Sequence, residues 1–343
     1  MSYTVKSSEK TTPSAATGET KALLYLMNLR TDSDEINYFV VDFFNDLTGM
    51  TRYADKLWDI QSKAEKNLSP RKVGQALVTL YKNFISSIEF KFYILFVGGV
   101  SDSLRIDKNK TEFDITNIKE SSLKIVREGL VNEAKDKDYI DKTLMTDDRI
   151  DDFLKKVLFV LDNKTSNEYV KAIIKDHPKI IPEDRILEAI FNEIRDEQSS
   201  KKNISKVEGI VIETAGEALN YYRHLTASEI RLMVLHRIIN RNPIEKGIPA
   251  PFLPIYNAVP PEKQSNLVDE CKQTLCRALF NKNAAKSFWT LFENIYNEIV
   301  SKPTSDVEVL YNAIDVGVKK SNPDFDLMSL KYFISVIKEG IQE

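Results

Sequence analysis

The sequence predicts an α+β N-terminal domain followed by an all-α C-terminal domain. Only 11 glycines and 12 prolines occur in 343 residues, which favours long helices with short connections over an all-β sandwich or barrel. Runs of β-branched and aromatic residues, which favour strands, lie between residues 37 and 118. From residue 147 onward, apolar residues recur at helical spacing in almost every segment. We therefore expect a flexible leader at 1–17, an α+β domain at 18–146 and a helical domain at 147–343.

The first expected helix runs from Glu19 to Leu29, where apolar residues form a stripe at helical spacing. A β-branched and aromatic run at 37–46 and a second run at 56–66 are expected to be the two strands of a hairpin. The stretch between them, 47–55, contains Gly49 and is expected to be a turn.

A second helix is expected to open at Ser69-Pro70, because serine is a favoured N-cap and proline fits the first helical position. A third strand is expected at 90–100, stopped by two glycines, and a short fourth strand at 111–118. The amphipathic segment 120–135 is expected to be a helix. The expected element order of this domain is thus α, β, β, α, β, β, α.

The second half of the chain is expected to consist of helices. The segments with helical periodicity are 148–161, 168–176, 182–198, 205–225, 228–242, 262–280, 284–300 and 305–320. The interruption at 242–263 holds six prolines and is expected not to be helical. It is either an ordered crossover or an exposed loop that binds a partner.

Composition limits the function classes. Lys and Arg total 48 against 51 Asp and Glu, a formal charge of -3, so any nucleic-acid contact needs a local basic patch. Cys271 and Cys276 would point to different faces of a helix, which predicts neither a disulfide nor a zinc site and suits a reducing cytoplasm. Apolar runs fall far short of the roughly 18 residues of a membrane span.

The second expected strand carries the most informative polar residues. Side chains alternate along a strand, so Asp59, Gln61 and Lys63 share one face. A carboxylate and an amide oxygen suit a hard divalent ion, and an ammonium group suits charge developing on a phosphate. Asp46 could return across the hairpin as a second metal oxygen, and Glu19 on the first helix is a third candidate.

The same pattern has a structural alternative. A polar face with Lys and Asp on a half-exposed edge strand prevents edge pairing and has no catalytic content. Basic residues around the second helix, Lys66, Arg71 and Lys72 with Lys63 and Lys82, are candidates for DNA contact. They equally suit a solvated helix face.

The order of motifs resembles the core of the PD-(D/E)xK nuclease superfamily: a helix with an acidic residue, a strand, an Asp, a strand ending in (D/E/Q)-x-K, and a helix. GETKALLYLMNL, FVVDFFNDL and LWDIQSKAEKNLSPRKVGQAL are similar to the Gln-x-Lys branch found in double-stranded-DNA endonuclease effectors of bacterial anti-phage systems. The resemblance covers residues 15–120. This branch includes the nuclease domain of CBASS effectors and the nuclease subunit of the Lamassu defence complex. The helical pattern of 147–343 suits the Lamassu subunit better than a mixed α/β nucleotide sensor.

The resemblance implies a restriction-endonuclease-like αββαβ core and a Mg²⁺ or Mn²⁺ ion. By this resemblance, Asp46 and Gln61 are metal ligands, Lys63 is the catalytic lysine and Glu19 is the helix-borne acid. Gln61 departs from the commoner carboxylate, and its neutral oxygen attracts magnesium less strongly, so Asp59 is a further metal candidate.

The strand carboxylate has two candidates, Asp42 and Asp46. We prefer Asp46 because it follows the apolar run, where the strand opens into the turn.

The resemblance further implies a bacterial cytoplasmic subunit held inactive by an SMC-like ATPase and an accessory subunit. Release would let it form a homo-oligomer and cut DNA, with 147–343 as the regulatory and assembly domain. Because one such site cuts one strand, double-strand cleavage requires at least two protomers. The rival hypothesis is a non-catalytic helical scaffold or adaptor with a degenerate nuclease fold, which Gln61 and the acidic net charge favour.

Overall fold

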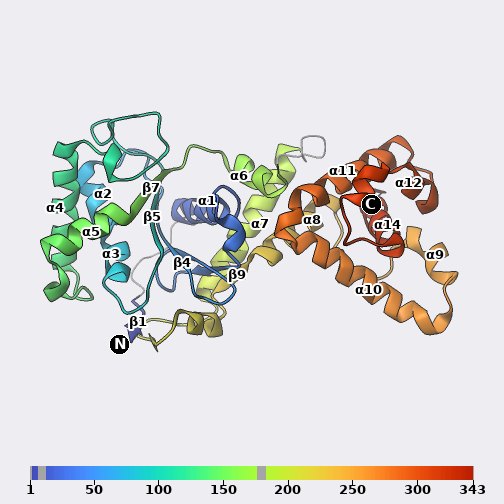
Figure 1. Ribbon diagram of the computed structural model, residues 1–343, viewed down its shortest axis with the longest axis horizontal. Helices are drawn as coiled ribbons and strands as arrows, with labels where there is room; N and C mark the ends of the chain where they lie inside the picture. The colour runs from blue at the N-terminus through green and yellow to red at the C-terminus, as the bar shows by residue number, and fades with distance from the viewer. Residues whose placement is uncertain (1, 7–12, 176–182, 343) are drawn as a thin grey trace. The chain divides into compact units, whose positions relative to one another are not determined.

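The computed structural model describes residues 2–6, 13–175 and 183–342 (Figure 1). The chain forms two compact units. Unit 1 comprises Met1–Thr165 and Glu193–Ala227, and unit 2 comprises Ser166–Asn192 and Ser228–Glu343.

The described part of unit 1 contains a seven-stranded mixed sheet in the order β6-β7-β5-β4-β3-β2-β9. These strands are β2 (Tyr38–Val41), β3 (Leu47–Met50), β4 (Leu57–Lys63), β5 (Phe92–Val97), β6 (Glu112–Phe113), β7 (Val157–Leu161) and β9 (His224–Thr226). Strands β2, β3 and β4 form an antiparallel meander, whereas β4, β5 and β7 run parallel. A separate small sheet pairs β1 (Tyr3–Thr4) with β8 (Val211–Ile212).

Helices cover both faces of the sheet, with α1 on one side and α2 to α5 on the other (Figure 1). The helices of unit 1 are α1 (Pro13–Asn28), α2 (Pro70–Ala76), α3 (Val78–Phe84), α4 (Glu120–Asp136) and α5 (Asp147–Lys156). Its 3-10 helices are η1 (Ser33–Glu35), η2 (Ile115–Asn117), η3 (Lys142–Leu144) and η5 (Ala215–Tyr221). Because side chains alternate along β4, its polar residues face α3 while Trp58, Ile60 and Ser62 face α1.

Unit 2 is helical in its described residues. Its helices are α6 (Ser166–Ile173), α8 (Ala227–Ile239), α9 (Leu253–Asn257), α10 (Pro261–Phe280), α11 (Ala285–Ser301), α12 (Val307–Ala313), α13 (Val316–Lys320) and α14 (Leu327–Gln342), with 3-10 helices η6 (Ala250–Phe252) and η7 (Lys282–Ala284). Helix α7 (Asp184–Asn203) begins in unit 2 and ends in unit 1. Phe288 and Phe292 of α11 are buried and pack on Phe333 of α14, with ring centroids 5.4 and 6.2 Å apart.

Several local predictions are confirmed. Ser69 caps α2 by accepting a hydrogen bond from the Lys72 amide, and Pro70 is the first helical residue. Strand β5 and helix α4 lie where the sequence predicts them. Cys271 and Cys276 are both free thiols. In the described ranges, every helix is too short or too polar to cross a membrane.

The predicted turn at 47–55 is wrong, because Leu47–Met50 is the middle strand of the meander. Gly49 suggested a turn, yet its backbone is extended and paired with Trp58. A Cβ at Gly49 would lie 3.0 Å from Leu26 of α1 and 3.3 Å from Ile36. The absence of a side chain at Gly49 therefore allows Leu26 and Ile36 to pack closely on this strand.

The expectation that 147–343 is wholly helical is also wrong. Helix α5 ends at Lys156, and the apolar run Val157–Leu161 is a parallel strand. A strand buried on both faces has no period-two pattern, so its apolar run is indistinguishable from a helix segment. The segment 205–225 forms two short strands and a 3-10 helix instead of an α-helix, and Gly209 and Tyr222 take positive φ angles within it. The division at residue 146 is not a boundary between the two units.

Two smaller expectations change as well. The leader predicted at 1–17 contains β1 and the first residues of α1, and residues 7–12 of it lie outside the described residues. Residue 176, the last of the predicted helix 168–176, and residue 182, the first of the predicted helix 182–198, also lie outside the described residues. The Pro-rich segment 242–263 contains η6, α9 and the start of α10, since prolines fit the first turn of each helix. Helix α14 was not among the predicted segments.

Glycines bring α2 and α4 into close contact. A Cβ on Gly74 of α2 would lie 2.0 Å from the Val126 carbonyl oxygen, and a Cβ on Gly129 of α4 would lie 2.4 Å from the Arg71 carbonyl oxygen. Both neighbours are backbone atoms, which cannot turn away as a side chain would.

Gly74→Ala is expected to destabilise unit 1 by about 3 kcal/mol, because the overpacking cost exceeds the roughly 1 kcal/mol by which alanine favours a helix. Thermal unfolding followed by circular dichroism measures the change. Gly216→Ala is the matched control, since the nearest atom to its new Cβ is 3.6 Å away. Equal melting temperatures for the two variants would contradict the close packing.

Candidate functional site

The candidate site begins with a hydrogen-bonded pair across β3 and β4. Leu47 pairs with Ile60 in antiparallel register, so Asp46 lies opposite Gln61. The Gln61 side-chain amide donates to Asp46 Oδ2 at 2.6 Å, and the Ser62 backbone amide donates to the same oxygen at 2.8 Å. The two residues predicted to share a metal ion are thus in direct contact.

Helix α3 supplies a third member, Thr79. Its hydroxyl donates to Gln61 Oε1. Gln61 is only 1% exposed, so its amide needs partners inside the protein, and Asp46 and Thr79 provide them at its two ends. Sequence reasoning did not select Thr79. Its signal was weak: Thr79 and Asn83 are polar residues four apart on helix α3, so they lie on one face of it.

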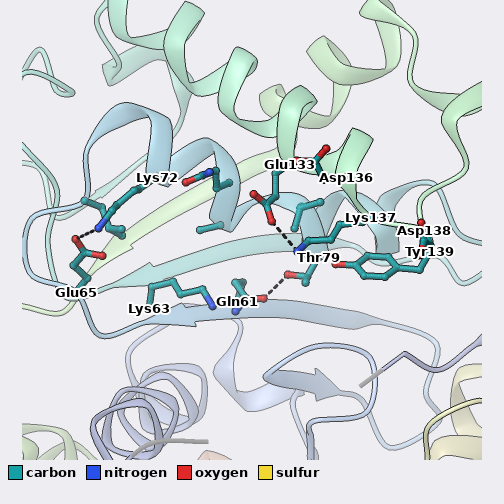
Figure 2. A pocket seen from close by; sticks show the side chains of 14 residues that line it. Gln61, Lys63, Glu65, Lys72, Thr79, Glu133, Asp136, Lys137, Asp138 and Tyr139 are labelled. Carbon is teal, nitrogen blue, oxygen red and sulfur yellow. Dashed lines mark hydrogen bonds and ion pairs between the residues drawn. The ribbon is translucent and has the colours of Figure 1, made fainter. Parts of the chain in front are cut away.

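Lys63 and Gln61 lie next to each other on β4 at the floor of a groove (Figure 2). The groove has a volume of about 620 Å³, and its walls come from α2, α3 and the C-terminal end of α4. Lys63 is half-buried. The predicted face of the strand is confirmed, since Asp59 and Gln61 both contact α3 and Lys63 lines the same side.

Asp59 belongs to a different, fully buried cluster. It has no exposed surface, and its Oδ2 accepts a hydrogen bond of 2.7 Å from the Asn83 amide. Burial raises the Asp59 pKa to about 7, against the opposing effects of Asn83 and Lys82. Burial also lowers the Lys82 pKa to about 8, which Asp59 partly counteracts. Asp59 does not line the groove, and its role as a metal ligand remains a prediction.

This cluster also anchors the turn that carries Asp46. The Phe44 carbonyl oxygen accepts hydrogen bonds from Lys82 Nζ at 3.1 Å, Asn83 Nδ2 at 3.2 Å and the Tyr3 hydroxyl at 3.3 Å. Tyr3 also donates to Asn83 Oδ1 at 2.9 Å. The segment expected to be a flexible leader therefore contributes to the support of the site.

Glu19 is buried on α1 and forms an ion pair with Lys202 of α7. Burial raises the Glu19 pKa, Lys202 and Lys63 lower it, and Asp42 raises it. The charge of Lys63 thus acts on Glu19, but the ion-pair partner of Glu19 is Lys202.

Asp42 is bound by Arg223 through both its carbonyl oxygen and its carboxylate. Its backbone takes a positive φ of 48°, and Arg223 donates to its carbonyl oxygen at 2.9 Å and pairs with its carboxylate at 3.3 Å. The preference for Asp46 over Asp42 as the strand carboxylate stays a prediction, and it is Asp46 that contacts Gln61.

The predicted DNA-contacting residues other than Lys82 lie at or beside the groove, whereas Lys82 is buried and donates to the Phe44 carbonyl oxygen. Lys66 and Arg71 are exposed, and Lys72 lines the groove, where it forms an ion pair of 2.7 Å with Glu65. Helix α2 has only seven residues, so its N-terminus adds no site of its own. Contact of these residues with DNA remains a prediction.

The residues at the site fit a weakly held magnesium ion. Asp46 offers a carboxylate and Gln61 an amide oxygen, and Mg²⁺ prefers oxygen ligands and often uses one or two carboxylates with substrate phosphates. A shared ion requires Gln61 Oε1 beside Asp46 in place of Nε2. Thr79 suits either orientation, because a hydroxyl both donates and accepts. Among the described residues, no group of three or more His, Cys, Asp or Glu is placed to hold a metal.

Comparisons with protein-family models, with curated proteins and with solved structures find no match for this chain. Its function is therefore inferred from the geometry of the site and from its motifs.

The buried Asp59 predicts a pH dependence of stability. Its pKa is raised to about 7 in the folded protein from about 4 in the unfolded chain, so the folded state binds the extra proton between these values. The free energy of unfolding of the wild type, relative to Asp59→Asn, should fall as pH rises from about 4 to about 7. Urea unfolding across this range measures it. A difference that stays constant with pH would show that Asp59 is ionised throughout.

Proposed function

We propose that this protein is a metal-dependent DNA endonuclease whose active site is formed by Asp46, Gln61 and Lys63. The observation that supports this most is the contact of Asp46 with Gln61 at 2.6 Å, with Lys63 two residues further on the same face of β4. Gln61 and Lys63 line an open groove, and the Asp46 carboxylate contacts Gln61 from a small adjoining pocket, so the three groups together suit a phosphodiester substrate.

Each residue has a separate task in this proposal. Asp46 and Gln61 would hold a magnesium ion, which supplies Lewis-acid activation of the scissile phosphodiester. The Lys63 ammonium group stabilises the negative charge that develops on the phosphate oxygens. Hydrogen bonds from Ser62 and Thr79 fix the first two side chains in advance, which limits the reorganisation needed during reaction.

The biological role is proposed from the resemblance of the motifs. By that resemblance, the protein is the effector subunit of an anti-phage complex, restrained by an SMC-like ATPase and an accessory subunit. The helices of unit 2 would form the assembly module. Because one site cuts one strand, cleavage of both strands would need two or more protomers.

The groove's charge favours the alternative of a non-catalytic scaffold. Its lining contains three lysines and four acidic residues: Lys63, Lys72, Lys137, Glu65, Glu133, Asp136 and Asp138. Such a balance gives no strong attraction for DNA. The scaffold hypothesis requires no metal binding at Asp46.

Cleavage of supercoiled plasmid by concentrated protein, with magnesium or EDTA, tests the proposal. Wild type should cut only with magnesium, and Lys63→Ala should lower the rate about 10²- to 10³-fold because a preorganised positive charge is lost. Asp46→Ala should remove cutting at least as completely. Lys91→Ala should cut as the wild type does, since Lys91 is exposed and pairs with the opposite end of β4.

The controls separate the two hypotheses. Cutting that persists in Asp46→Ala and Lys63→Ala would come from another site or another protein. No magnesium-dependent cutting by the oligomeric protein, tested with its partner subunits, would favour the scaffold.

A further inference from the structure

Three lysines from three different elements converge on the groove above Gln61. Lys63 comes from β4, Lys72 from α2, and Lys137 from the C-terminal end of α4 (Figure 2). Lysine side chains on the floor and on two walls of one groove are suited to successive phosphates of a nucleic-acid backbone. Lys137 had no place among the sequence-based candidates.

Two of these lysines are each paired with a glutamate of the same groove. Lys72 lies 2.7 Å from Glu65, and Lys137 lies 2.8 Å from Glu133. The Lys72 and Glu65 side chains are 54% and 46% exposed, and those of Lys137 and Glu133 are 36% and 24% exposed. Figure 2 shows the Lys72–Glu65 pair at one end of the groove and the Lys137–Glu133 pair above Thr79, with Tyr139 and Asp138 beyond it.

The end of α4 is held firmly in place. Lys142 Nζ donates to the carbonyl oxygens of Ala134 and Lys137, each at 2.5 Å, in addition to the backbone amides that these two carbonyls accept. Gly129 packs α4 against the α2 backbone one to two turns earlier. The wall that carries Glu133 and Lys137 is therefore fixed relative to the wall that carries Lys72.

We infer that the groove is a DNA-backbone site in which Glu65 and Glu133 act as internal counter-ions of Lys72 and Lys137, which phosphates displace on binding. Exposed ion pairs contribute little to stability, so breaking them costs the protein little. Their effect on binding is larger, because each glutamate that stays in the groove repels the phosphates. Glu65 and Glu133 thus lower the affinity for DNA by direct competition for the lysines, beyond the general repulsion from Asp136 and Asp138 of the same groove. This inference rests on the proposed function for the identity of its ligand.

The inference predicts that removing either glutamate charge increases the affinity for DNA. A variant that had lost its fold would bind DNA more weakly, so misfolding cannot explain such an increase. Glu133→Gln and Glu65→Gln should each strengthen binding of a fluorescent double-stranded DNA oligonucleotide several-fold, and the double variant should strengthen it further. Glu128→Gln, an exposed residue of α4 outside the groove, makes the same change in net charge and should alter binding much less. Anisotropy in EDTA measures binding without cleavage.

Lysine variants test the same groove through an expected decrease in DNA affinity. Lys137→Ala should weaken binding and reduce the slope of log affinity against log salt by about 1, as expected for one lost phosphate contact. Lys135→Ala is the matched control, because Lys135 is exposed on α4 but does not line the groove. Equal effects of Lys135→Ala and Lys137→Ala would overturn the inference.

The outcomes distinguish this inference from the proposed endonuclease activity. Stronger binding by the glutamate variants without any cutting would support the groove and reject the nuclease. Magnesium-dependent cutting with affinities that do not respond to Glu65→Gln or Glu133→Gln would support the nuclease and overturn the groove. No DNA binding by the wild type or by the double glutamate variant would also overturn the groove.

Discussion

Asp59 is a carboxylate without exposed surface, so it depends on partners inside the protein, and Asn83 of α3 donates a hydrogen bond to one of its oxygens, Oδ2. Asn83 donates to Asp59 and to the Phe44 carbonyl, which ties the helix both to β4 and to the turn that precedes Asp46. Lys82 joins the same cluster. These hydrogen bonds tie the helix, the strand and the turn together, and loss of the Asn83 side chain would leave a buried carboxylate and a buried carbonyl short of partners.

The candidate site follows from this constraint. Thr79 is one helical turn before Asn83, so the helix that satisfies Asp59 also places a hydroxyl on Gln61. The hydrogen bonds to the Phe44 carbonyl hold the turn that places Asp46 next to the other end of the Gln61 side-chain amide. Two side chains that are fifteen residues apart in sequence therefore meet with little freedom left, which is the condition that a metal or phosphate site requires.

The groove above the site has a different character. Two of its lysines, Lys72 and Lys137, form ion pairs with glutamates of the same groove at partly exposed positions, so these pairs add little to folding and are available to a charged ligand. The near balance of charge in the groove matches the near balance in the whole chain.

The sequence by itself determined the local features. The Ser69-Pro70 helix start and the polar face of Asp59, Gln61 and Lys63 both follow from rules that act within a few residues. Tertiary structure decided which segments join the sheet. Val157–Leu161 becomes a strand and Gly49 sits within one because of partners that are distant in sequence. The partners Thr79, Asn83 and Lys202 could not be predicted for the same reason, since pairing between elements depends on packing that no local pattern encodes.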